Sequence, residues 1–221
     1  MVAMACRTPI CLAVPDLGGV TPRHWLALWQ RRHDDFHRID MGAWDDPLRN
    51  SALSHIDENV RRARAPVILV AHGVGALAVA WWAALLGKRA ARRVQGALLV
   101  GPVDAERADA EERVRRFGPI PTAMLPFPSI VVASENDPYV DLDRARDIAS
   151  EWTSDFVNAG PVGHFGTDAR LGHWPLGERM LDILMSGGPG LSRYTYRPEP
   201  PVRTSVRRQI EKVPGMHRAG L

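Results

Sequence analysis

The sequence predicts an α/β protein, a three-layer α/β/α sandwich in which a mostly parallel, doubly wound sheet lies between two layers of helices. Short apolar runs alternate along the chain with stretches of helical length, which is the pattern of repeated strand–helix–strand units. One run, residues 66–71 (PVILVA), is apolar throughout, as expected for a central strand covered on both faces. The 221 residues are 45% hydrophobic and 24% charged, which is the composition of an ordinary globular domain.

The predicted strands are short, mostly apolar runs that end at turn-forming residues. The first run, ICLAV, stops at Pro15, and the second is the weakest because polar residues interrupt it. In chain order the predicted strands are residues 10–14, 36–41, 66–71, 94–100, 129–134 and 156–159.

The predicted helices are the longer stretches between these strands. In the first of them Trp25, Leu28 and Trp29 recur at helical spacing and form one apolar face. The third, VGALAVAWWAALL, is apolar on all sides and is therefore expected to be buried. Residues 102–125 are polar and then proline-rich, and we expect them to cross over the sheet without regular structure. In chain order the predicted helices are residues 21–33, 51–64, 74–86, 142–152 and 175–185.

The charge is unevenly distributed and divides the chain into two parts. Residues 186–221 carry a net charge of +5 and are rich in proline and glycine, whereas residues 1–185 carry −2. We therefore expect one domain over residues 1–185 and a flexible basic tail over residues 186–221. A solvated extension is the simpler interpretation of the tail, and contact with nucleic acid or an acidic surface is the alternative.

Several classes of protein are excluded or disfavoured by what the sequence lacks. No apolar run approaches the ~20 residues that span a bilayer, and the first residues lack the pattern of a secretion signal. The two cysteines, Cys6 and Cys11, form no disulfide framework, so a cytoplasmic location is expected. No HExxH, CxxC or P-loop motif occurs, so the sequence predicts no metal, no cofactor and no nucleotide phosphate site.

A possible active site follows from three segments at the expected carboxyl ends of strands. Residues 67–75 (VILVAHGVG) read as strand, tight turn and helix, the layout of a nucleophile elbow, and small residues flank the turn. Asp137 follows a later strand and His164 follows the last one. An elbow, an acid and a histidine in this chain order are typical of hydrolases that use a catalytic triad.

These and other stretches make the sequence similar to small bacterial α/β-hydrolases of the retinoblastoma-binding-protein-nine-like serine hydrolase family. The resemblance implies hydrolysis of a small ester or amide, with His164 as the base, Asp137 orienting it, and the backbone N–H groups of Leu17 and Val74 forming the oxyanion hole. It extends over about residues 12–181 and rests on the stretches VPDLGG, VILVAHGVGALAVAWWA, GALLVGPVD, FGPIP, LPFPSIVVASENDPYVDLDRARDIASEW and GHFGTDARLGHWPLG.

The sequence departs from the family pattern at two positions. Gly73 stands where the family has its nucleophilic serine, and glycine has no side chain that could form an acyl-enzyme. Asp16 stands in the first loop, where the family has a glycine, and a carboxylate there opposes stabilisation of an oxyanion unless it points away. In subtilisin, removal of the nucleophile lowers kcat by about 10⁶, so we expect catalysis to be impaired.

Three functions remain open at this stage. The chain is a catalytically dead family member that binds a ligand or a protein partner, a residual hydrolase in which His164 activates a water directly, or a protein that binds nucleic acid or an acidic surface through its tail. For Gly73, a glycine turn in an unrelated α/β fold and an introduced substitution are further alternatives. His72 is expected to pack or hydrogen-bond within the elbow, and Trp44 to line the rim of the pocket.

Overall fold

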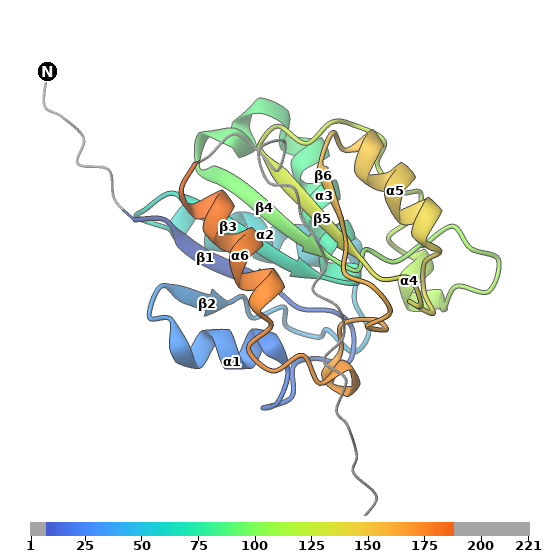
Figure 1. Ribbon diagram of the computed structural model, residues 1–221. Coiled ribbons are helices and arrows are strands. Elements are labelled where there is room, and N and C mark those ends of the chain that lie inside the picture. The colour runs from blue at the N-terminus through green and yellow to red at the C-terminus, as the bar shows by residue number, and fades with distance from the viewer. Residues whose placement is uncertain (1–7, 188–221) are drawn as a thin grey trace, which may run out of the picture.

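The computed structural model describes residues 8–187, and the remaining residues lie outside the part considered below. The predictions about the basic tail therefore concern residues that are almost all outside the described part of the chain. Within it, six strands form a single sheet in the order β2-β1-β3-β4-β5-β6, with every neighbouring pair parallel (Figure 1). The strands are β1 (Ile10–Val14), β2 (Phe36–Arg38), β3 (Val67–His72), β4 (Val94–Val100), β5 (Ser129–Ala133) and β6 (Asp155–Asn158).

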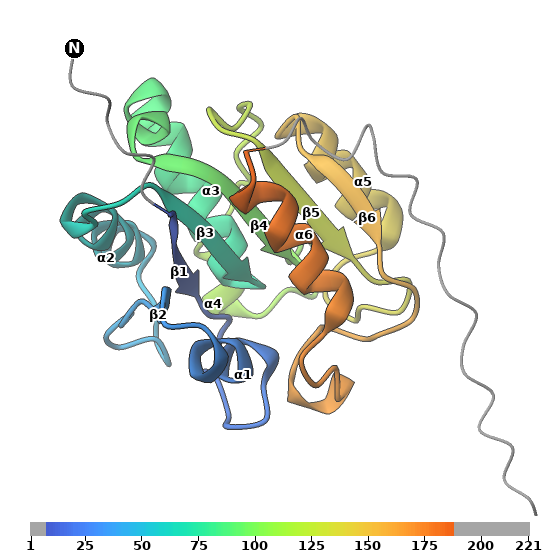
Figure 2. The same cartoon turned by 60° about the vertical axis from the view of Figure 1, so that its left-hand side comes forward.

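Helices cover both faces of this sheet, which confirms the predicted three-layer α/β fold (Figure 2). One layer contains α1 (Trp25–Arg32) and α6 (Pro175–Met185). The other contains α2 (Arg49–Arg62), α3 (Val74–Leu86) and α5 (Leu142–Glu151). Among residues 8–187, no helix has both the length and the apolar character that crossing a membrane requires.

The alternation of side chains along the strands explains how one sheet supports two cores. In β3, Ile68 and Val70 point into the core beneath α1 and α6, whereas Leu69 and Ala71 point into the core beneath α3. All of β3 is buried, and so is most of α3, because this helix packs along the centre of the sheet. Continuous apolar sequence at these two elements is therefore a consequence of burial on all sides.

The structure corrects several element boundaries. The helix predicted at residues 21–33 begins at Trp25, because a turn closed by the His24 N–H and the Thr21 carbonyl precedes it and His24 Nδ1 accepts from Leu26 N–H at 3.2 Å. The strand predicted at residues 36–41 ends at Arg38, since this edge strand pairs only with β1. The 3₁₀ segments Gly87–Arg92 and Thr167–Ala169, and the short helix α4 (Glu112–Arg115), were not predicted.

The chain direction across the sheet locates the region where a site can form. From β1 the chain goes to β2 on one side and then to β3 on the other. The loops that leave the carboxyl ends of β1 and β3 therefore run in opposite directions, which opens a crevice between them. Asp16 follows β1 and Gly73 follows β3, and the register that pairs Val14 with Ala71 brings them to the same level.

Cys11 is buried in β1, and the reactivity of its thiol reports how well the sheet excludes solvent. Burial, together with the charge of Asp35, raises the pKa of the Cys11 thiol to about 12. At about pH 8 its thiolate fraction is therefore about a thousandfold below that of an ordinary cysteine. In a Cys6→Ser variant, we expect Ellman's reagent to modify Cys11 rapidly only after unfolding in guanidinium. Fast modification in the native state would show that β1 opens readily.

Candidate active site

The turn between β3 and α3 has the geometry of a nucleophile elbow. Gly73 lies at its apex with φ +56° and ψ −123°, a conformation that side-chain-bearing residues rarely adopt. Two residues further on, a Cβ on Gly75 would lie 2.6 Å from the carbonyl oxygens of Val14 and Pro15. The first turn of α3 thus packs directly against the backbone that leads into the Asp16 loop.

The predicted acid and histidine meet at the same edge of the sheet. Asp137 follows β5 and His164 follows β6, and His164 Nδ1 donates to the Asp137 carboxylate at 2.8 Å to Oδ2 and 3.0 Å to Oδ1. The Asp137 side chain is fully buried, and its Oδ1 also accepts from the Tyr139 N–H at 2.9 Å. Trp25 on α1 donates to the carbonyl of Phe165 at 3.0 Å and so fixes the histidine loop. The aspartate therefore orients the imidazole from a fixed position.

Asp16 points into the site instead of away from it. Its Oδ1 accepts from the Val74 N–H at 2.7 Å, and its Oδ2 lies 3.1 Å from His164 Nε2. A Cβ built on Gly73 would lie 2.0 Å from Oδ1. The carboxylate therefore occupies the space that a side chain at residue 73 would need. It also accepts the hydrogen bond of the Val74 N–H.

Trp44 fixes the loop that carries Asp16 through a hydrogen bond to its backbone. The Trp44 indole N–H donates to the Asp16 carbonyl at 2.9 Å, and its ring packs edge-on against Phe117 with the centroids 6.1 Å apart. Trp44 is buried and supports this loop, and its place at the rim of the pocket stays a prediction. Leu17 follows Asp16 in the turn and packs, partly buried, against the core.

The charges of the site are strongly coupled. Burial would lower the pKa of His164, but its hydrogen bonds to Asp137 and Asp16 and the charges of both carboxylates raise it to about 9. Burial would raise the pKa of Asp16, yet the hydrogen bond from His164, the neighbouring imidazoles and the Val74 amide keep it below its usual value. At neutral pH an imidazolium at His164 therefore faces a carboxylate at Asp16.

His72 lies beneath this array and is only 3% exposed. Its Nε2 lies 2.7 Å from the His164 carbonyl oxygen, and because a carbonyl can only accept, Nε2 carries the proton. Burial and the positive charge of His164 lower the pKa of His72 despite the charge of Asp16, so the ring is neutral. Its Nδ1 is therefore unprotonated, and it is buried without a hydrogen-bond partner.

The structure thus brings together six residues that the sequence singled out, and it adds two that the sequence analysis missed. The six are Asp16, His72, Gly73, Val74, Asp137 and His164. Tyr139 packs edge-on against His164 with the centroids 4.6 Å apart, and His24 packs against His72 at 5.3 Å. The place of each residue in the sequence could have indicated that it lies near the site. Tyr139 lies two residues after Asp137, and His24 directly precedes the helix that begins with Trp25.

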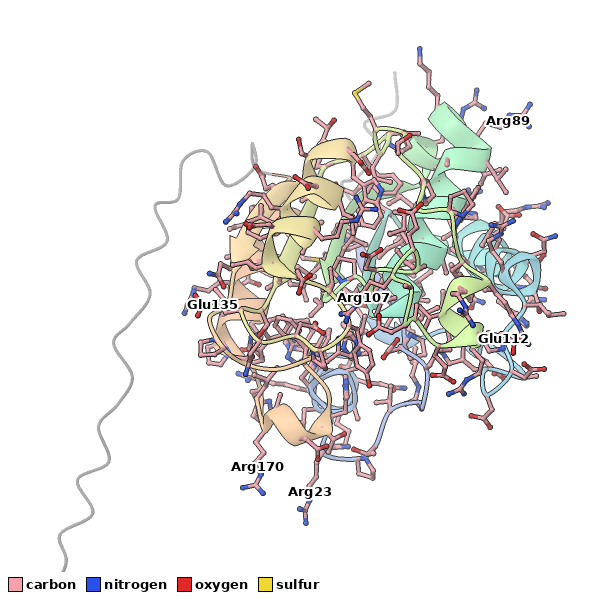
Figure 3. The ribbon with its side chains drawn as sticks, turned by 90° about the vertical axis from the view of Figure 1, so that its right-hand side faces the viewer. Arg23, Arg89, Arg107, Glu112, Glu135 and Arg170 are labelled. Atoms are coloured by element: carbon pink, nitrogen blue, oxygen red, sulfur yellow. The ribbon has the colours of Figure 1, made fainter. Side chains whose placement is uncertain are left out.

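A hollow of about 370 Å³ adjoins the site beside Tyr139. Its walls come from the segment between β4 and β5, on which Arg107 is seen near the centre of the view in Figure 3, and from the loop after Asp137. Arg107 also donates to the Pro138 carbonyl at 2.9 Å and so ties the two walls together. The walls combine charged and apolar residues: Val103, Asp104, Arg107, Asp109, Ala110, Glu111, Val114, Pro138 and Tyr139.

A parallel doubly wound sheet with an elbow after β3, an acid after β5 and a histidine after β6 defines an α/β-hydrolase fold. The comparison with protein families identifies the particular group. The chain belongs to the serine hydrolase family, whose model matches residues 11–183.

Solved structures agree with this assignment. A protein described as a YdeN-like hydrolase from Pectobacterium atrosepticum is 27% identical with a TM-score of 0.71, over 82% of this chain and 94% of that chain. The ydeN gene product of Bacillus subtilis is 18% identical with a TM-score of 0.67, over 81% of this chain and all of that chain. Est1E from Butyrivibrio proteoclasticus, 14% identical with a TM-score of 0.57 over 80% and 88%, shares the fold. The comparison with curated proteins found no match.

Proposed function

We propose that this serine hydrolase family member does not perform serine-based acyl transfer and acts as a binding protein for a small ligand or a protein partner. Gly73 takes the place of the nucleophile and Asp16 takes the place of its side chain. The observation that supports this proposal best is the Asp16 carboxylate, which lies 2.7 Å from the Val74 amide and 3.1 Å from His164 Nε2.

Each component of acyl transfer is affected by these two residues. A serine hydrolase needs a hydroxyl beside the imidazole, a neutral imidazole to accept its proton, and free amides to hold the oxyanion. Here the hydroxyl is missing, the imidazole is held charged between two carboxylates, and the Val74 amide already binds a negative oxygen. A second negative oxygen would meet electrostatic repulsion at this amide.

A residual hydrolase that uses a water activated by His164 is less consistent with the same geometry. Such a water would need a hydrogen bond to His164 Nε2. The Asp16 carboxylate lies at hydrogen-bonding distance from this nitrogen, and its presence keeps the imidazole protonated. The hollow beside Tyr139 favours ligand binding, since it adjoins His164 without depending on the elbow.

Covalent labelling and turnover test the proposal directly. We expect a fluorophosphonate probe to leave the purified chain unlabelled, and p-nitrophenyl esters to be hydrolysed no faster by the chain than by a His164→Ala variant. The reason is that neither a nucleophile nor a free base is present. Labelling at the elbow, or turnover that disappears in His164→Ala, would contradict the proposal, and the second result would favour the water mechanism.

A further inference from the structure

We propose that Asp16, His72 and His164 form a binding site for one divalent transition-metal ion of the zinc class. A carboxylate oxygen of Asp16 and one ring nitrogen from each histidine lie within 4.8 Å of one another. The three residues come from the loop after β1, the end of β3 and the loop after β6. The inference goes beyond the loss of serine chemistry and does not depend on it.

The hydrogen bonds of His72 leave it ready to bind a cation. Its Nε2–H donates to the His164 carbonyl, so the lone pair of the ring resides on Nδ1. This nitrogen has no hydrogen-bond partner although the residue is 3% exposed. A buried acceptor without a donor is unfavourable, and a bound ion would remove this deficit.

A hydrogen bond also fixes the orientation and the tautomer of His164. Its Nδ1–H donates to the buried Asp137 carboxylate at 2.8 Å, which directs Nε2 toward Asp16. Histidines that bind metals usually donate their second ring N–H to a carboxylate or a backbone carbonyl, which fixes the tautomer. Both histidines of this cluster have such a partner, Asp137 for His164 and the His164 carbonyl for His72.

The distances suit a small ion after a modest adjustment. Two ligand atoms about 2.1 Å from a tetrahedral ion are about 3.4 Å apart, and His164 Nε2 and Asp16 Oδ2 are 3.1 Å apart. One ring nitrogen of His72 lies within 4.8 Å of a ligand atom of each of the other two residues, so it has to approach them by at most about 1.4 Å.

The charge of the site also favours a cation. Within residues 8–187, the ion pairs of Asp16 and Asp137 are both with His164, so one imidazolium faces two carboxylates. A divalent ion in place of the proton on Nε2 would balance both negative charges. Buried charges in proteins are either paired or coordinate metals.

The donor set selects the class of ion. Two imidazoles and one carboxylate match the ligands that zinc and neighbouring first-row metals use, whereas magnesium and calcium prefer oxygen ligands alone. Three protein ligands leave a fourth position of a tetrahedral ion open for water or a ligand. Asp16 and His164 are partly exposed, with side-chain exposures of 16% and 12%, so this position can be reached from solvent.

Metal titration of the full chain tests the site. After treatment with a chelator and dialysis, Zn²⁺ is titrated against a chromogenic chelator, and Co²⁺ binding is followed by its visible absorption. We expect one equivalent bound per chain with submicromolar affinity, and a Co²⁺ spectrum of four-coordinate intensity. Asp16→Asn and His72→Gln should each weaken binding by about a hundredfold or more, because each removes a ligand while keeping the shape of the side chain.

Two surface substitutions serve as matched controls, since Asp34 and His37 are exposed and lie outside the cluster. Asp34→Asn and His37→Gln should bind both metals like the natural chain. No saturable binding by the natural chain would overturn the proposal, as would stoichiometric binding that Asp16→Asn leaves unchanged. If His72→Gln does not fold, the Asp16→Asn titration and the Co²⁺ spectrum of the natural chain still test the proposed metal site. None of these results bears on the probe experiment above.

Discussion

A variant that combines Asp16→Gly with Gly73→Ser is expected to react with a fluorophosphonate probe, whereas each single variant is expected to remain unlabelled or nearly so. Gly73→Ser alone supplies a hydroxyl, but its Cβ would lie 2.0 Å from Asp16 Oδ1 and 2.8 Å from Asp16 Cβ. Asp16→Gly alone clears the space and frees the Val74 amide, but it supplies no nucleophile. Only the double variant has a hydroxyl, a base and a free oxyanion amide, so its labelling should be faster by roughly 10³-fold or more.

The controls separate chemistry from folding. Asp16→Gly with Gly73→Ala removes the carboxylate without adding a hydroxyl, and it should not be labelled. Adding His164→Ala to the double variant should abolish the gain, because His164 would activate the serine. Circular dichroism and melting temperature establish that each variant is folded. Equal labelling of Gly73→Ser and the double variant would show that Asp16 does not block the site.

The positions of Asp16 and Gly73 therefore depend on each other in this structure. The carboxylate of Asp16 can reach the Val74 amide and His164 only because residue 73 has no Cβ. A serine at residue 73 would in turn force Asp16 out of a position stabilised by two charge-assisted hydrogen bonds. Residues in direct contact show non-additive effects, so a double-mutant cycle on Asp16 and Gly73 should give a large interaction term.

The alternation of strands and helices was predictable because burial on both faces of a parallel sheet leaves continuous apolar runs in the sequence. The bounds predicted for β1, α3, β4 and α6 agree with the structure. The predicted start of α1 was wrong, because a turn closed between Thr21 and His24 replaces the first helical turn. Local hydrogen bonds of this kind leave no periodic signal that a hydrophobic pattern could report.

The sequence predicted which residues lie at the strand ends that form the site. It did not predict the directions in which their side chains point. The order of an elbow, Asp137 and His164 along the chain placed these groups at one edge of the sheet. The sequence also identified Asp16 as a departure, but it could not show where the carboxylate points, since the rotamer depends on the space above Gly73. The unpartnered Nδ1 of His72 results from a tautomer that the His164 carbonyl selects, and this contact spans 92 residues.

Gly75→Ala is expected to lower the free energy of unfolding by about 2–3 kcal/mol, the effect of overpacking at a rigid contact. The added Cβ would meet the carbonyl oxygens of Val14 and Pro15 at 2.6 Å, and a backbone cannot rotate away as the end of a side chain can. The loop that carries Asp16 would have to move from α3. For a chain of this size we expect the melting temperature to fall by about 4–12 °C, measured by circular dichroism.

Gly166→Ala is the matched control for this effect. Nothing lies within 4 Å of a Cβ at Gly166, and its φ of −73° is accessible to alanine. This variant should change stability by no more than about 0.5 kcal/mol. If Gly75→Ala and Gly166→Ala melt at the same temperature, the tight contact between α3 and the loop after β1 contributes little to stability. If only Gly75→Ala is destabilised, the close approach of these two backbones stabilises the fold.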